Sequence, residues 1–187
     1  YFGISLSIGL SIALFGREVI ALVSDPKYLE AHRVVPFISA AAVFHGFYYL
    51  TSVSIFYRKK TNLIPLLTGL VGAINILLNL KWLPMFGYMG AAYATTVSFF
   101  ILCLLSYIVG RRMYAIKFPL GKIVTISLVA VLIFRISQFT MDYPLLLSLL
   151  LKFMFLAGFL VLLLAMKIFT IKDLQTIKIL LRLREQR

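Results

Sequence analysis

The residue best suited to binding chemistry is Lys152, which lies inside a long apolar stretch that begins at Pro144. Eight residues of helix place it about 12 Å past Pro144, well within a hydrocarbon core about 30 Å thick. A central lysine costs about 2.5–3.5 kcal/mol to insert, which the surrounding leucines and phenylalanines offset. Such a charge normally faces a bundle interior or a water-filled groove. Lys152 is therefore a candidate contact for an anionic ligand, with a structural or snorkelling role as the alternative.

Arg135 is the second cation inside an apolar stretch. It lies seven residues before Asp142, about 10 Å of helix rise, so its side chain can reach the membrane surface by snorkelling. We expect snorkelling, and a contact with an anionic ligand is the alternative.

Uncharged polar residues also stand in apolar surroundings. Asn75 and Asn79 are four residues apart and share one face of a helix. An unpaired amide in hydrocarbon costs several kcal/mol, so both need partners on another helix or in a wet cavity. His45 forms a similar polar stripe with Tyr48 and Tyr49. These residues are either structural hydrogen-bonding groups or part of a translocation path, and His45 is also a candidate for a substrate or proton role.

Other chemistries lack the residues that they need. His32 and His45 are not at a metal-ligand spacing, no Walker-type glycine-rich loop occurs, and no nucleophile has an evident base beside it. All six acids are expected in loops, in the tail or at the edges of apolar stretches. The sequence therefore predicts no enzyme, no metal or organic cofactor and no ATP-driven pump.

Composition predicts the class of protein that holds these residues. Of 187 residues, 62% are hydrophobic and 13% are charged, whereas a soluble domain is usually about 45–50% apolar and about 25% charged. The same values exclude a disordered chain, and the single cysteine, Cys103, excludes a secreted disulfide scaffold. Because the basic residues do not gather on one face of a soluble fold, nucleic acid is not an expected partner. We predict an all-α polytopic membrane protein.

Six stretches meet the requirement of about 20 mostly apolar residues for a spanning helix. Their apolar runs are continuous, which argues against β-barrel strands. We expect a six-span domain over 1–170 and an amphipathic interfacial helix over 171–187 that binds the anionic cytoplasmic leaflet. Small residues such as Gly9, Gly72 and Gly90 are expected to form packing faces. The expected spans are 1–24, 34–56, 62–83, 87–109, 121–140 and 144–170.

The distribution of basic residues indicates the orientation of the chain. The connections after the second and fourth stretches, together with the tail, hold thirteen basic residues and two acids, whereas the opposite side holds four of each. This asymmetry places the basic side and the C-terminus in the cytoplasm. The chain starts inside an apolar stretch at Tyr1, without a methionine or signal peptide, so we expect it to be the C-terminal part of a longer membrane protein.

Three segments carry a family resemblance. The segment from Asn75 to Thr95 combines an Asn-rich helix end, a Leu-Pro-x-Phe-Gly turn and a Gly-Ala-Ala-x-Ala-Thr helix start. The second runs from Phe15 to Tyr28, with Ser-Asp in place of the usual small-residue turn before its proline, and the third is the Tyr-Arg-Lys-Lys loop at 57–60. These segments resemble the C-terminal half of polysaccharide exporters of the multidrug/oligosaccharidyl-lipid/polysaccharide superfamily, in which the three parts of the first segment come in the same order. The resemblance covers roughly residues 15–122.

The resemblance implies an inner-membrane flippase-type transporter with two lobes of helices around a central cavity, this chain forming the second lobe. Such O-antigen and exopolysaccharide translocases move polyprenyl-diphosphate-linked oligosaccharides to the outer leaflet, so a lipid-linked oligosaccharide and the missing N-terminal lobe are the implied partners. Lys152 and Arg135 would be the candidate diphosphate contacts, and Asn75, Asn79 and His45 the candidate sugar contacts.

Three other functions remain open. A drug/cation antiporter of the MATE type belongs to the same superfamily, but it would need acids within the membrane. A membrane-bound glycan polymerase or ligase would need a large outer loop, and the outer connections here are short. A non-functional remnant is the third alternative.

Overall fold

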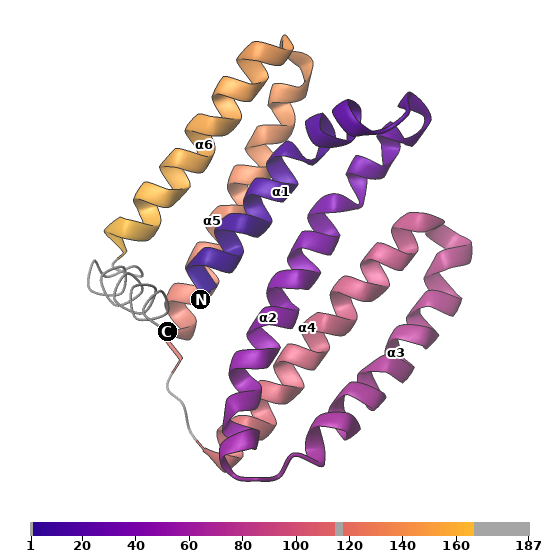
Figure 1. The fold of residues 1–187 in the computed structure, drawn as a ribbon, viewed down its shortest axis with the longest axis vertical. Coiled ribbons are helices and arrows are strands. Elements are labelled where there is room, and N and C mark those ends of the chain that lie inside the picture. The colour runs from indigo at the N-terminus through magenta and orange to yellow at the C-terminus, as the bar shows by residue number, and fades with distance from the viewer. Residues whose placement is uncertain (1, 115–117, 167–187) are drawn as a thin grey trace, which may run out of the picture. The chain divides into compact units, whose positions relative to one another are not determined.

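The computed structural model describes residues 2–114 and 118–166, which form long helices with short connections and, in these ranges, no strand (Figure 1). Six helices in the described residues are long and apolar enough to cross a membrane, which confirms the prediction of an all-α, multi-pass membrane protein. The helices are α1 (Phe2–Val23), α2 (Val35–Tyr57), α3 (Leu63–Phe86), α4 (Tyr88–Met113), α5 (Leu120–Gln138) and α6 (Leu145–Ala165), with the 3-10 helices η1 (Pro26–Arg33) and η2 (Phe139–Asp142).

The helices agree with the expected spans except near some ends. Helix α3 continues through Pro84 to Phe86, and α4 continues to Met113 with two arginines in its last turn, where cations complement the helix dipole. Helix α1 runs unbroken past Glu18 to Val23, so Glu18 lies inside a helix of spanning length, near its C-terminal end. The predicted interfacial helix at 171–187 lies outside the described residues.

The chain divides into two compact units. Helices α1 to α4, apart from Gly3, belong to the first unit, which extends to Pro119. Helices α5 and α6 belong to the second, which begins at Leu120.

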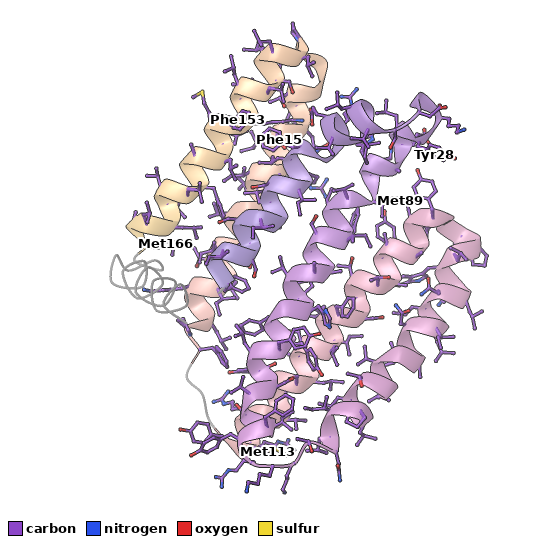
Figure 2. The ribbon with its side chains drawn as sticks, in the orientation of Figure 1. Phe15, Tyr28, Met89, Met113, Phe153 and Met166 are labelled. Atoms are coloured by element: carbon purple, nitrogen blue, oxygen red, sulfur yellow. The ribbon has the colours of Figure 1, made fainter. Side chains whose placement is uncertain are left out.

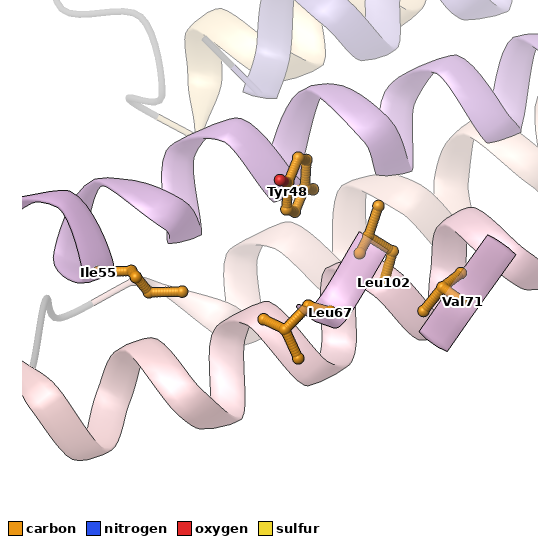
Figure 3. Close-up of a cluster of buried hydrophobic side chains, with 5 residues drawn as sticks. All are labelled: Tyr48, Ile55, Leu67, Val71 and Leu102. Atoms are coloured by element: carbon orange, nitrogen blue, oxygen red, sulfur yellow. The ribbon is translucent and has the colours of Figure 1, made fainter. Parts of the chain in front are cut away.

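In the first unit, α4 lies between α2 and α3 and packs against both (Figure 1). A cluster of buried apolar side chains joins the three helices, as Figure 3 shows. Because lipid is as apolar as these side chains, close van der Waals packing rather than burial from water holds such an interface together. The cluster consists of Tyr48 and Ile55 from α2, Leu67 and Val71 from α3, and Leu102 from α4.

Glycines allow the closest approaches within this unit. A Cβ added at Gly110 of α4 would lie 2.9 Å from the Thr51 carbonyl oxygen of α2. A Cβ at Gly90 would overlap the carbonyl oxygen of Trp82 across the α3–α4 turn, and Gly87 in that turn has a φ of +57°, which favours glycine. A Cβ at Gly9 of α1 would lie 3.1 Å from a methyl group of Val43 on α2. The expected packing faces of the first and fourth helices are therefore used.

The expected packing face of α3 makes no contact with the described residues. Gly69 and Gly72 are exposed, and an added Cβ at either position would meet no described atom within 4 Å. Helix α3 instead turns Leu67 and Val71 toward the buried cluster. Bulkier apolar residues on the opposite face of the helix thus make the contact, and the glycines face away from α4.

The second unit is a helical hairpin whose buried residues fall on one face of each helix. Thr140 in η2 donates a hydrogen bond to the carbonyl oxygen of Ser137, 2.7 Å away, and its hydroxyl lies 3.4 Å from that of Ser148. At the other end, the Lys122 ammonium donates to the carbonyl oxygen of Met166 at 3.3 Å. The buried residues are Ile126, Ala130 and Ser137 on α5, and Ser148, Lys152, Phe159 and Leu163 on α6.

We predict that Gly110→Ala destabilises the first unit by about 1–3 kcal/mol, because the new methyl group is forced against α2. The matched substitution Gly72→Ala adds the same atom in open space and should leave stability unchanged or slightly higher. Thermal unfolding of the two variants in detergent measures the difference. Equal melting temperatures would contradict the close α2–α4 contact.

Candidate functional site

Lys152 is buried inside the protein. Only 1% of the residue is exposed, and it shares the buried face of α6 with Ser148, one turn earlier, and with Phe159 and Leu163. The side chain therefore does not face lipid, in agreement with the expectation for a charge in the middle of a span. An ammonium group has three hydrogen-bond donors, so this position offers positive charge and directed donors within an otherwise apolar helix.

Buried hydroxyl groups lead from the hairpin turn toward Lys152. Ser137, Thr140 and Ser148 are each at most 4% exposed. The Thr140 and Ser148 hydroxyls are 3.4 Å apart, and Ser148 precedes Lys152 by one helical turn on the same face. Since a hydroxyl can both donate and accept a hydrogen bond, these three hydroxyl groups are suited to hydrogen bonding with phosphate oxygens, sugar hydroxyls or water.

Arg135 has a different environment from Lys152. It lies in the last turn of α5, near the hairpin turn, and it is exposed. A cation at a helix C-terminus complements the helix dipole, and its long side chain can extend to the membrane surface. The structure thus favours the snorkelling alternative for Arg135 over a ligand contact.

Asn75 and Asn79 continue the stripe of Leu67 and Val71 along α3, at four-residue intervals. The Asn75 side-chain amide donates to the hydroxyl of Ser98 on α4 at 3.1 Å. The Asn79 amide donates to the backbone and side-chain oxygens of Asn75 at 2.9 and 3.1 Å. The amides therefore have partners, as the structural alternative predicted, and both residues remain partly exposed.

His45 lies among aromatic rings. Its ring is nearly parallel to that of Tyr48, with centroids 5.8 Å apart, and 4.5 Å from the ring of Phe99 on α4. The exposed Tyr49 ring lies 4.8 Å from His45. Because Phe99 directly follows Ser98, helix α4 brings the histidine of α2 and the asparagines of α3 to the same level. Planar aromatic and amide groups of this kind suit the apolar faces and the hydroxyl groups of a sugar.

A polar contact between α2 and α4 was not predicted. The Ser106 hydroxyl lies 2.7 Å from the Thr51 hydroxyl and 3.2 Å from the Ser52 hydroxyl, and all three residues are buried. Toward the other end of the same interface, Thr96 donates to the carbonyl oxygen of Phe37 at 2.9 Å. The signal in the sequence was a hydroxyl residue on each of two apolar helices, but only the helix register decides which of them meet.

The candidate residues therefore fall into two groups, one in each unit. Asn75, Asn79 and His45 gather around α4, and Lys152 and Arg135 belong to the α5–α6 hairpin. No group of three or more histidine, cysteine, aspartate or glutamate side chains that could hold a metal ion occurs within residues 2–114 and 118–166.

No protein-family model, curated protein or solved structure matches this sequence. The family resemblance therefore rests on the three quoted segments and stays a prediction. Local backbone geometry explains why two positions of the longest segment are glycine. Gly87 has a positive φ, and Gly90 permits the close approach to Trp82.

We predict that Asn75 and Ser98 are energetically coupled. A double-mutant cycle with Asn75→Ala and Ser98→Ala should give an interaction energy of about 0.6 kcal/mol, and at most about 1.7 kcal/mol, as for other hydrogen bonds between membrane helices. Unfolding of the four proteins in detergent measures it. Thr68 is the matched control, because its hydroxyl donates to carbonyl oxygens of its own helix; coupling of Asn75 to Thr68 as strong as to Ser98 would contradict the contact.

Proposed function

We propose that this chain forms one lobe of a membrane transporter that flips polyprenyl-diphosphate-linked oligosaccharides across the cytoplasmic membrane for the synthesis of surface polysaccharide, such as O-antigen or exopolysaccharide. An N-terminal lobe completes the transporter, and the C-terminus lies in the cytoplasm. The resemblance of residues 15–122 to polysaccharide exporters supports this proposal.

The observation that carries the proposal is the burial of Lys152 on α6. Burying a cation in a span is costly, and such residues commonly belong to substrate paths. A diphosphate carries negative charge and several acceptor oxygens, so a buried ammonium and nearby hydroxyls complement it better than they complement a neutral or cationic substrate. The role of Lys152 is therefore to bind the diphosphate.

The polar groups around α4 supply the second requirement of this substrate. An oligosaccharide needs hydrogen-bonding groups and aromatic surfaces along its path. Asn75 and Asn79 on α3 and the rings of His45 and Tyr49 on α2 meet this need and remain partly exposed or exposed. In the proposed transporter they contact the sugars.

A drug/cation antiporter of the MATE type is the second candidate, because Glu18 lies inside α1 and its Oε2 atom is buried. An acid within a span is the group that a cationic substrate or a coupling ion would need. The sequence analysis disfavoured the antiporter for lack of acids within the membrane, and the position of Glu18 inside α1 now supports it. The antiporter provides no role for the buried Lys152, so we rank it second.

We predict that Lys152→Met lowers surface polysaccharide at least about tenfold, because a charge-assisted hydrogen bond to the diphosphate is lost. Lys152→Arg, which keeps the charge, should retain part of the export. A strain deleted for the full-length gene and complemented with each variant provides the measurement, with gel analysis of extracted polysaccharide and an immunoblot of the membrane fraction.

The matched control is Lys81→Met, which removes an exposed lysine from α3 and should leave export unchanged. Normal export by Lys152→Met at normal membrane abundance would remove Lys152 from the mechanism. Unchanged surface polysaccharide after deletion of the gene would overturn the proposed function itself.

Glu18→Gln separates the two candidate functions. If the chain belongs to a flippase, this substitution should leave drug susceptibility unchanged relative to the unmodified gene. A loss of resistance to cationic drugs in the Glu18→Gln strain, with normal surface polysaccharide, would favour the antiporter instead. Minimum inhibitory concentrations for a panel of cationic drugs provide the readout.

A further inference from the structure

Five exposed basic residues gather where α2 and α4 end and α3 begins. Arg58, Lys59 and Lys60 form the α2–α3 connection, and Arg111 and Arg112 lie in the last turn of α4. We call these five residues the basic end. The acids described in this unit lie elsewhere along the chain: Glu18 in the second half of α1, and Asp25 and Glu30 in and beside η1.

A hydrogen bond and an aromatic contact hold the two halves of the basic end together. The Arg58 Nε group donates to the carbonyl oxygen of Met113 at 3.0 Å, next to Arg112; Met113 is labelled at this end of the unit in Figure 2. The ring of Tyr57 lies 4.8 Å from the ring of Tyr114, and both tyrosines are exposed. Tyrosines that flank a span typically lie at the level of the lipid headgroups.

The backbone places Lys59 where glycine is usual. The Lys59 amide donates to the carbonyl oxygen of Phe56 at 2.9 Å, and the Lys60 amide donates to that of Ile55 at 3.3 Å. These two bonds form a Schellman motif, which ends a helix with a residue in the left-handed region, most often glycine. Here that residue is Lys59, with a φ of 56°. A lysine therefore stands in this tight turn against the local backbone preference.

Helix capping explains only some of the basic residues of the basic end. Cations near a helix C-terminus complement its dipole, and the effect is confined to the last turn. Arg58 also caps α4 directly through Met113. Lys59 and Lys60 lie beyond the end of α2, in an exposed turn, so their charges face the medium at the membrane surface.

We propose that the basic end is a binding site for the headgroup of an anionic phospholipid, such as phosphatidylglycerol. Basic clusters immediately beside spanning helices attract anionic lipids, at about a fivefold gain in affinity for each lysine or arginine. A lipid fits this site better than a dissolved anion because the exposed tyrosine pair lies beside the charges, where the glycerol and upper acyl region would pack. The inference is independent of the proposed transport function.

The test is native mass spectrometry of the full chain in detergent, with phosphatidylglycerol or phosphatidylcholine of the same chain length. Substituting Lys59, Lys60 and Arg112 together by Gln should lower phosphatidylglycerol binding at least about tenfold. Arg58 is kept, since it bonds to Met113. The matched variant replaces Lys27, Arg33 and Lys81, three exposed cations outside the basic end, and should change binding less than about twofold.

Three results would overturn the site: equal losses in the two triple variants, equal binding of phosphatidylcholine, or complete displacement of the lipid by excess inorganic phosphate, which would indicate a general anion site. Circular dichroism verifies that both variants keep their helices. In the unmodified protein, high salt should weaken phosphatidylglycerol binding, since the interaction is between exposed charges; salt-independent binding would also contradict the proposal.

Discussion

The hydrocarbon core of a bilayer offers no hydrogen-bond partner, and this constraint organises the whole structure. Helices satisfy the backbone within each span, but polar side chains must find partners on their own or a neighbouring helix. Ser106 meets two hydroxyl groups of α2, and Asn75 meets Ser98. These contacts accompany close packing at Gly110, where α2 and α4 nearly touch. The polar contacts therefore specify which faces of α2, α3 and α4 meet, while the apolar cluster fills the space between them.

The same constraint separates the two cations of the α5–α6 hairpin. Arg135 lies in a last helical turn, where its side chain can reach water, and its position needs no further explanation. Lys152 is buried on the same face as Ser148, within a helix of spanning length. Binding a lipid-linked diphosphate would make use of this charge. The charges of the basic end are exposed, so the lipid contact proposed for them requires no burial.

Much of the fold could be predicted, because spanning helices are determined by length and hydropathy, which are properties of the one-dimensional sequence. The helix contacts were harder to predict. Glycines show where a close approach is possible but not which neighbour comes close, so the sequence did not reveal that the glycines of α3 face away from α4. The partner of Asn75 depends on the register between α3 and α4, which no sequence pattern specified. The interior position of Lys152 followed from the energetics of charge in lipid.

We expect these helices to cross a membrane with their connections on alternating sides. Cysteine labelling tests this arrangement: Tyr28→Cys and Lys60→Cys are introduced singly into a Cys103→Ser background and treated with a membrane-impermeant maleimide in intact cells. The cysteine at 28 should be labelled, and the cysteine at 60 should react only after the cells are permeabilised. Labelling of both positions in intact cells, or of neither, would contradict the alternating arrangement.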